Sequence, residues 1–253
     1  MQGKTAIVTG ASKGIGLAVV RALAGAGATV LAAARSRTSE LETLAEAGGV
    51  RWVGADLTDP AAPAALLEAA GGAVDVLVNN VGAAPTRTGG FLSVSDAEWQ
   101  RTLELNLLSA VRMTRAVLPS MLERRSGAIV TVASLNASLP DPLVIDYSAA
   151  KAALVSFSKA LSKEVAAKGV RVNTVSPGPV ETDLWLGGAG VAATVSAEAG
   201  LRPEEVVAGA LAQIPSGRFS TPDEVAQAVL FLAGAGNITG SDLVVDGGMR
   251  PTW

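Results

Sequence analysis

Tyr147 is the one tyrosine of this chain, and Lys151 follows it four residues later in the segment YSAAK. Residues four apart lie on one face of an α-helix, so we expect the ammonium near the phenol oxygen. A neighbouring positive charge stabilises a phenolate and lowers the pKa of a tyrosine from its ordinary value near ~10. Such a tyrosine can give a proton to a carbonyl oxygen or take it back, although a tyrosine and a lysine at this spacing often have no function.

Histidine and cysteine are both absent from the sequence. Their absence excludes disulfides, thiolate nucleophiles, Ser-His triads and nearly every zinc site, so we expect no metal. A general acid must then be Asp, Glu, Lys or Tyr147.

The composition is that of a folded protein with a sizeable core, since 49% of the 253 residues are hydrophobic and 17% are charged. A net charge of −3 with mostly scattered basic residues predicts no nucleic-acid partner. No uncharged apolar run reaches the ~18 residues of a membrane span, so we expect no membrane partner. The first residues, MQGK, lead directly into the apolar TAIV without a signal-like block, and we expect a cytoplasmic protein.

The elements that must position Tyr147 and Lys151 alternate between strands rich in Val and Ile and helices rich in Ala. Fully apolar strands separated by helices indicate a parallel sheet that is covered on both faces. The patterns predict strands at 5–10, 29–34, 50–56, 74–80, 127–134, 170–176 and 243–246, and helices at 14–26, 41–47, 63–70, 95–121, 147–167 and 222–232. We therefore predict one α/β domain over residues 1–253, a single-domain Rossmann fold with a doubly wound parallel sheet of about seven strands. Residues 183–217 are rich in Gly and Ala, have weaker periodicity and are predicted to form a lid.

The segment TGASKGIG, residues 9–16, lies between the first predicted strand and the first predicted helix. Glycines at this place let the backbone turn sharply and approach a pyrophosphate, and the helix N-terminus offers free N–H groups. Such turns also occur for packing alone, but the position in the first strand-to-helix turn favours dinucleotide binding. The residues that we assign to this part of the site are Gly10, Ser12, Lys13, Gly14, Ile15 and Gly16.

The end of the second predicted strand bears on the choice of cofactor. A site for NAD usually has an acidic residue here, but this chain has Ala34, followed by Arg35 and Ser36. Arg35 can bind a 2′-phosphate through two hydrogen bonds and Lys13 adds a second cation, so NADP(H) is favoured unless both are merely solvated surface cations. Asp56, followed by Leu57, accepts from the adenine amino group or caps the next helix.

Ser134 is predicted to end the fifth strand, 13 residues before Tyr147. Open α/β sheets bind ligands at the carboxyl ends of their strands, where the Ser134 hydroxyl can hold a substrate carbonyl. The alternative is a small polar residue that ends a strand. Asn136 can hydrogen-bond a second substrate oxygen or cap a turn.

Taken together, these features resemble the short-chain dehydrogenase/reductase family over essentially the whole chain. The matching features, in order, are TGASKGIG, Asp56, NNVG at 79–82, Asn106, Ser134, YSAAK, Asn173, SPGPVET at 176–182 and NITGSDLVVDGG at 237–248. The resemblance implies that Ser134, Tyr147 and Lys151 are catalytic and that Asn106 holds a water that relays protons to Lys151, which also binds the nicotinamide ribose. It further implies cofactor contacts from Asn80, Gly82, Pro177, Gly178, Val180 and Thr182. Val81 stands where alanine is usual in the family.

Three functions fit this resemblance. The first is NADPH-dependent reduction of a bulky hydrophobic ketone, such as a polycyclic aromatic polyketide of antibiotic biosynthesis, beneath an apolar lid that includes Trp185, Val191 and Ala192. The second is 3-oxoacyl-[acyl-carrier-protein] reduction, because Arg125 and Lys168 lie at or near positions where such reductases have basic residues for the carrier protein. The third is a nonenzymatic NADPH-binding regulator. The family also implies a homotetramer.

Overall fold

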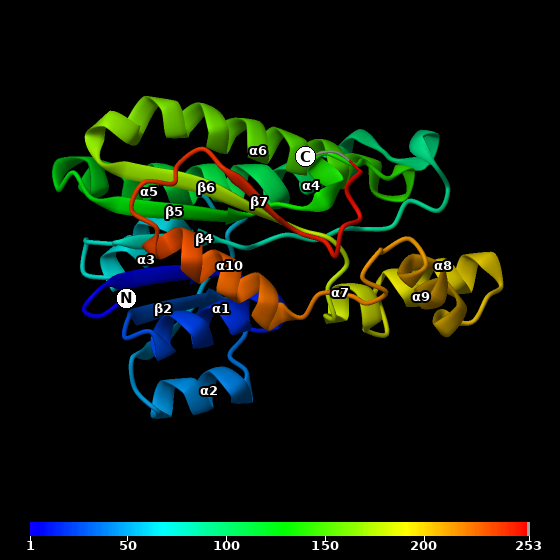
Figure 1. Ribbon diagram of the computed structural model, residues 1–253, viewed down its shortest axis with the longest axis horizontal. Coiled ribbons are helices and arrows are strands. Elements are labelled where there is room, and N and C mark those ends of the chain that lie inside the picture. The colour runs from blue at the N-terminus through cyan, green and yellow to red at the C-terminus, as the bar shows by residue number, and fades with distance from the viewer. Residues whose placement is uncertain (252–253) are drawn as a thin grey trace.

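The computed structural model describes residues 1–251, so Thr252 and Trp253 of the predicted domain lie outside the described residues. Within residues 1–251 a seven-stranded sheet has the order β3-β2-β1-β4-β5-β6-β7, and all neighbouring strands are parallel. The strands are β1 (Thr5–Thr9), β2 (Thr29–Ala34), β3 (Val50–Gly54), β4 (Val76–Asn79), β5 (Gly127–Val132), β6 (Val170–Pro177) and β7 (Asp242–Val245). This sheet confirms the predicted fold class (Figure 1).

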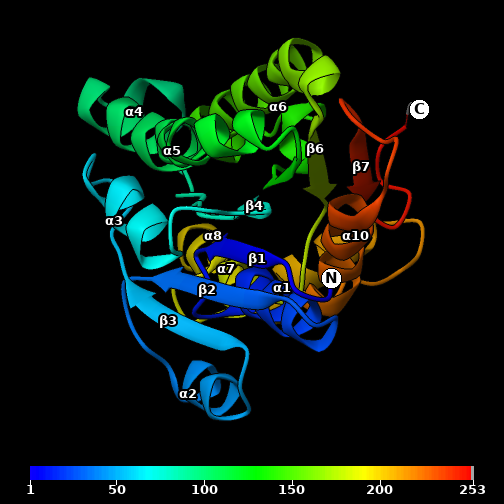
Figure 2. The same ribbon diagram turned by 90° about the vertical axis from the view of Figure 1, so that its left-hand side faces the viewer.

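Helices cover both faces of the sheet, as Figure 2 shows. They are α1 (Gly14–Gly25), α2 (Ser39–Glu46), α3 (Ala62–Ala69), α4 (Asp96–Leu103), α5 (Ser109–Glu123), α6 (Ile145–Val165), α7 (Asp183–Leu186), α8 (Val191–Ala199), α9 (Pro203–Leu211) and α10 (Pro222–Gly234). Leu23 of α1 and Val229 of α10 pack on one face of the sheet, whereas Met113 of α5 and Leu161 of α6 pack on the other. Burial on both faces explains why the strands are apolar throughout rather than alternating.

The predicted helix 95–121 is interrupted by a π-helical turn. The chain forms α4, then the π turn Glu104–Leu108, then α5. The side-chain amide of Asn106 donates to the carbonyl of Thr102 at 3.0 Å. That carbonyl is the acceptor that the backbone N–H of Asn106 would use in a regular α-helix, so competition for it accompanies the wider turn.

Residues 183–217, which we predicted to form a lid, contain α7, α8 and α9. These helices project from one end of the molecule, beyond the sheet (Figure 1). Residues 191–195 of this segment lie in α8, which extends to Ala199. None of the helices in residues 1–251 has the length and apolarity needed to cross a membrane.

Candidate active site

Ser134, Tyr147 and Lys151 come together at the carboxyl end of β5. Ser134 follows that strand closely, Tyr147 lies in the first turn of α6, and Lys151 lies one turn further along. All three side chains are buried, and the Ser134 side chain hydrogen-bonds the phenol of Tyr147. The ammonium of Lys151 lies 5.5 Å from the centre of the Tyr147 ring and donates to the carbonyl of Val132 at 3.0 Å. The helical spacing thus places the Lys151 ammonium beside the Tyr147 ring.

The expected pKa of Tyr147 is corrected by the structure. Burial raises the pKa of the Tyr147 phenol above its ordinary value, and the hydrogen bond with Ser134 opposes this only in part. Burial also lowers the pKa of Lys151 to about 8. Desolvation disfavours the charged form of each group and outweighs the attraction that their spacing predicts. Tyr147 therefore keeps its proton at neutral pH, which suits a proton donor.

Asn106 braces the segment that follows β4. Its side-chain amide donates to the carbonyl of Ala83 at 3.0 Å, and its Oδ1 accepts from the N–H of Ala83 at 3.1 Å. Gly82 lies between Asn106 and Lys151, because a Cβ on Gly82 would stand 2.8 Å from Asn106 Oδ1 and 3.3 Å from Lys151 Nζ. Glycine is therefore required where the chain passes this close to both polar side chains.

The turn at residues 9–16 has the shape that a bound dinucleotide requires. Gly10 and Gly14 have φ angles of +63° and +53°, which side chains other than glycine rarely adopt. A Cβ on Gly16 would stand 2.1 Å from the carbonyl oxygen of Gly10, so glycine is needed for close packing as well. Asn80 holds the turn by donating to the carbonyls of Thr9 and Gly10. The first turn of α1 has no acidic residue, so its backbone N–H groups can donate hydrogen bonds to a bound anion.

The predicted adenosine end of the site brings Arg35 and Asp56 to neighbouring strand ends. Arg35 is exposed, and its guanidinium forms no ion pair with residues 1–251, whereas Arg37 pairs with Glu42 at 3.2 Å. Hydrogen bonds from the backbone and side chain of Thr58, with a smaller contribution from the charge of Arg35, lower the pKa of Asp56. The bonds to Thr58 close a turn ahead of α3 and do not cap that helix, which begins at Ala62 and has no side-chain cap, so the capping alternative for Asp56 is wrong. Ser36 is exposed, and Leu57 is buried in the hydrophobic core on the face of the sheet that α5 and α6 cover.

Lys13, the second cation predicted for the 2′-phosphate, already has an acidic partner. Its ammonium pairs with Asp183 Oδ2 at 2.9 Å, at the first residue of α7, and both side chains are exposed. The phosphate turn is thus tied to the start of the lid segment. Ile15 is half-buried on α1.

The segment after β6 lies against the same turn. Thr182 contacts Gly14, since a Cβ there would stand 3.2 Å from Thr182 Cγ2. Gly178 passes close to Asp246, and Val180 is buried beside Ser220. These contacts bring Pro177, Gly178, Val180 and Thr182 to the carboxyl end of the sheet, between the phosphate turn and α7.

The predicted substrate residues have different environments. Asn136 contacts Ser134 twice, because its N–H donates to Ser134 Oγ at 3.2 Å and its Oδ1 accepts from that hydroxyl at 3.2 Å. Trp185 packs edge-on against Phe219 with ring centres 5.2 Å apart. Ala192 is buried and Val191 is half-buried. In the structure Asn136 therefore contacts Ser134, and these two hydrogen bonds orient the Ser134 hydroxyl.

Two apolar side chains were missed in the sequence. Leu139 and Leu143 lie between Ser134 and Tyr147 in the chain and are exposed. Leu184 and Leu186 on α7, which belong to the predicted lid, are exposed as well. Leucines in the loop between two candidate catalytic residues were the available signal. Arg87 and Asp146 were also missed and form an ion pair beside Tyr147.

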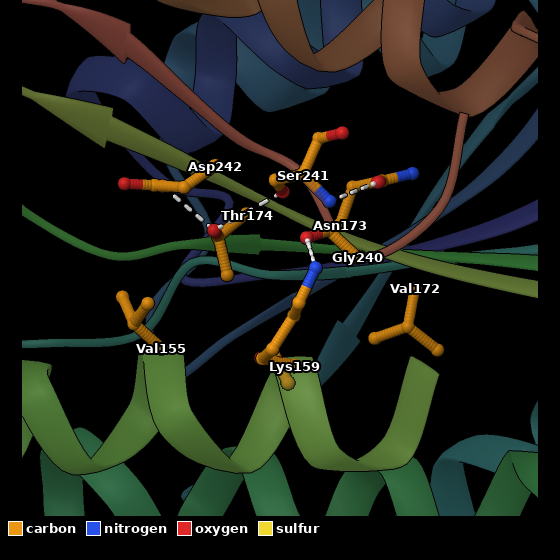
Figure 3. A pocket seen from close by; sticks show the side chains of 9 residues that line it. Val155, Lys159, Val172, Asn173, Thr174, Gly240, Ser241 and Asp242 are labelled. Carbon is orange, nitrogen blue, oxygen red and sulfur yellow. Dashed lines mark hydrogen bonds between the residues drawn. The ribbon is translucent and has the colours of Figure 1, made fainter. Parts of the chain in front are cut away.

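Two hollows mark the described surface near α6. One, of about 300 Å³, is lined by residues of α4 and of the segment 83–87 and borders Asn106. The other, of about 130 Å³, lies between α6 and strands β6 and β7 (Figure 3). There Lys159 donates to the carbonyl of Gly240 at 2.7 Å and Thr174 donates to Asp242 at 2.6 Å. Both charged groups of the second hollow thus have hydrogen-bond partners within the protein, Lys159 a backbone carbonyl and Asp242 a threonine hydroxyl. Residues 1–251 contain no cluster of acidic residues that could hold a metal ion.

Comparisons with known proteins agree with this geometry. The family model of the short chain dehydrogenases matches residues 4–187. The chain is 39% identical over 255 residues to the 3-oxoacyl-[acyl-carrier-protein] reductase FabG of Escherichia coli, and 40% identical over 257 residues to that of Vibrio cholerae; each match covers 98% of both chains. A crystal structure of a proposed NAD(P)-dependent gluconate 5-dehydrogenase from Beutenbergia cavernae, with bound NADP at low occupancy, has a TM-score of 0.85 and 37% identity and covers 98% of this chain and 97% of that one. An oxidoreductase of the short chain dehydrogenase/reductase family from Burkholderia thailandensis has a TM-score of 0.83 and 37% identity, covering 100% of this chain and 94% of that one.

Proposed function

The chain belongs to the short-chain dehydrogenase family, and we propose on this premise that it is an NADP(H)-dependent reductase that turns a ketone into a secondary alcohol. The observation that carries the proposal is the buried set of Ser134, Tyr147 and Lys151 at the carboxyl end of β5. Bound NADPH would supply the hydride that the carbonyl carbon receives. A protein that only senses NADPH would need no such set of groups, which argues against the regulator.

The residues of this chain fit that cofactor. The glycine turn at 10–16 would hold the pyrophosphate through backbone N–H groups, and Arg35 would hold the 2′-phosphate. Lys151 would bind the nicotinamide ribose, while the segment 177–182 would border the ring. The NADP of the Beutenbergia structure supports this assignment.

Tyr147 is the proposed proton donor. Its phenolic O–H gives a proton to the carbonyl oxygen as that oxygen becomes an alkoxide, so the product is an alcohol. With substrate bound, the Ser134 hydroxyl would donate to the same oxygen in place of Asn136 Oδ1, while the N–H of Asn136 still donates to Ser134 Oγ and orients it. The phenolate left behind is stabilised by the Lys151 ammonium, which lies 5.5 Å from the ring centre. Burial of all three groups strengthens these interactions, since water is excluded.

A 3-oxoacyl thioester is the substrate class that we favour. The support is 39% identity over nearly the whole length to a reductase named for 3-oxoacyl carrier-protein substrates. Arg125 and Lys168 are also neighbours, because the Arg125 guanidinium donates to the carbonyl of Ala167 at 2.9 Å. They lie beyond the far end of α6 from Tyr147, a helix of 21 residues that spans about 30 Å.

A bulky hydrophobic ketone, such as a polycyclic one, is the second candidate. It is favoured by the exposed leucines that face solvent on both sides of the site, Leu139 and Leu143 before α6 and Leu184 and Leu186 on α7. Burying apolar surface contributes ~25 cal/mol per Å², so a large ring system would gain most from such a rim. None of the relatives reported above is named for a polyketide substrate.

Measuring kcat/KM by NADPH absorbance separates these candidates. The substrates are an acetoacetyl thioester, a polycyclic quinone-type ketone and a small cyclic ketone. We expect the thioester to exceed both ketones by at least about tenfold, the factor that corresponds to ~1.4 kcal/mol. A higher kcat/KM for the polycyclic ketone would assign the enzyme to the second class, and no turnover with any carbonyl would contradict the reductase proposal itself.

A further inference from the structure

Asp146 is a fully buried carboxylate that directly precedes Tyr147. Arg87 donates to both of its oxygens, from Nη2 to Oδ2 at 2.5 Å and from Nε to Oδ1 at 3.3 Å. The hydroxyl of Thr102 donates to Oδ2 at 2.7 Å. Burial alone would raise the pKa of Asp146, but these hydrogen bonds and the charge of Arg87 hold the pKa below its ordinary value. The first turn of α6 is therefore held by a charged, bidentate contact.

Arg87 connects this turn to two other segments. Its guanidinium donates to Glu98 Oε1 at 2.8 Å, and its backbone N–H donates to the carbonyl of Leu143 at 2.7 Å. Glu98 in turn caps α4, since its Oε2 accepts from the N–H of Ser95 at 2.9 Å. The guanidinium side chain is only 11% exposed. One arginine thus joins the segment after β4, the start of α4 and the start of α6.

Thr102 links the same network to Asn106. Its hydroxyl holds Asp146, while its carbonyl accepts from the side-chain amide of Asn106 at 3.0 Å. Asn106 also fixes Ala83 and lies against Gly82, which separates it from Lys151. A single residue of α4, Thr102, therefore bonds both Asn106 and Asp146, the residue that precedes Tyr147.

We propose that Arg87 and Asp146 are positioning residues, which fix the Tyr147 phenol relative to Ser134, Lys151 and the substrate carbonyl. The inference rests on the proposed role of Tyr147 as proton donor. A buried ion pair adds little net stability compared with well-packed apolar residues of the same size, whereas its bidentate geometry restricts orientation strongly. Proton transfer requires hydrogen-bond distance, and a displacement of about 1 Å can reduce a rate by roughly 100-fold.

The test compares Arg87→Met, Asp146→Asn and the double variant. Arg87→Met leaves Asp146 charged and unpaired, so we expect Tm to fall by about 6–20 °C and kcat by at least about tenfold. Asp146→Asn removes the charge and one of the two oxygens that Arg87 binds, and we expect a similar loss in kcat. The double variant removes the isolated charge and should regain most of the lost Tm, yet its kcat should stay low. In every variant KM for the ketone and Kd for NADPH should stay within about threefold, because neither residue contacts the proposed cofactor site.

Arg171→Met is the matched control. Arg171 is partly buried near the start of β6, where it donates to the carbonyls of Leu232 at 2.6 Å and Ala233 at 2.7 Å. This variant should lower Tm without changing kcat. The positioning role would be overturned if kcat recovered together with Tm in the double variant, or if Asp146→Asn kept the wild-type kcat. Full activity of Tyr147→Phe would instead overturn the proposed function, so the two failures can be told apart.

Discussion

Arg35 is expected to set the preference for NADPH over NADH. It is exposed at the end of β2, makes no ion pair within residues 1–251, and has no acidic residue beside it at Ala34. A hydrogen bond to a charged group contributes ~1.5–3 kcal/mol, so a single such bond to the 2′-phosphate corresponds to roughly 10- to 150-fold in kcat/KM. Arg35→Ala should therefore lower kcat/KM for NADPH by about that factor and leave the value for NADH unchanged. Steady-state kinetics with both cofactors measure the two ratios.

Arg37 serves as the control for this prediction. Arg37 already pairs with Glu42, and Lys13 pairs with Asp183, so neither is as available to a phosphate as Arg35. Exposed ion pairs are worth ~0–1 kcal/mol, and we expect Arg37→Ala to change kcat/KM for NADPH less than about fivefold. Equal kcat/KM for NADPH and NADH in the unmodified enzyme, or an equal loss on both cofactors in Arg35→Ala, would refute the assignment.

Three further predictions follow from buried or closely packed positions. Lys151→Met should abolish turnover but increase stability at pH 7, because folding lowers the pKa of Lys151 from 10.5 to about 8. Between these two pH values the unfolded chain binds a proton that the folded chain does not, so the stability of the wild type rises with pH from about 8 to 10.5. The stability advantage of the variant, measured by urea denaturation, should therefore shrink over that pH window. Gly82→Ala should reduce kcat at least about tenfold, since its Cβ would stand 2.8 Å from Asn106 Oδ1, and an unchanged kcat would show that this approach is not tight. We propose a homotetramer in which α6 packs across a two-fold axis, since Ala149 and Ala152 are exposed small residues on that helix. Light scattering should give a tetramer for the wild type and a smaller species for Ala152→Arg. A wild-type monomer at micromolar concentration would contradict this proposal.

The sheet could be predicted from the sequence because its strands are apolar on both faces and short. Runs such as TAIVT and GAIVTV have few alternatives to a buried strand, and the helices between them fixed parallel pairing. The approach of Ser134 to Tyr147 also followed, since one residue ends a strand and the other begins the next helix. Local pattern and connection length were sufficient for both.

The rest depends on contacts between distant side chains. Arg87 and Asp146 are 59 residues apart, and nothing in either local sequence indicates the ion pair. The π turn at Asn106 depends on a bond to Thr102, and the pairing of Lys13 with Asp183 spans 170 residues. The pKa of Tyr147 was predicted in the wrong direction because helical spacing shows the neighbouring charge but not the burial of both groups.

The most direct test of the account is the turnover of Tyr147→Phe. This change removes the phenolic oxygen and leaves the ring, the Lys151 contact to Val132 and the glycine turn in place. General acid catalysis is worth ~10²–10⁴-fold, so kcat should fall by about that factor while NADPH binding, followed by fluorescence titration, stays within about threefold. Retention of more than about a tenth of the wild-type kcat would contradict the assignment of Tyr147 as the proton donor.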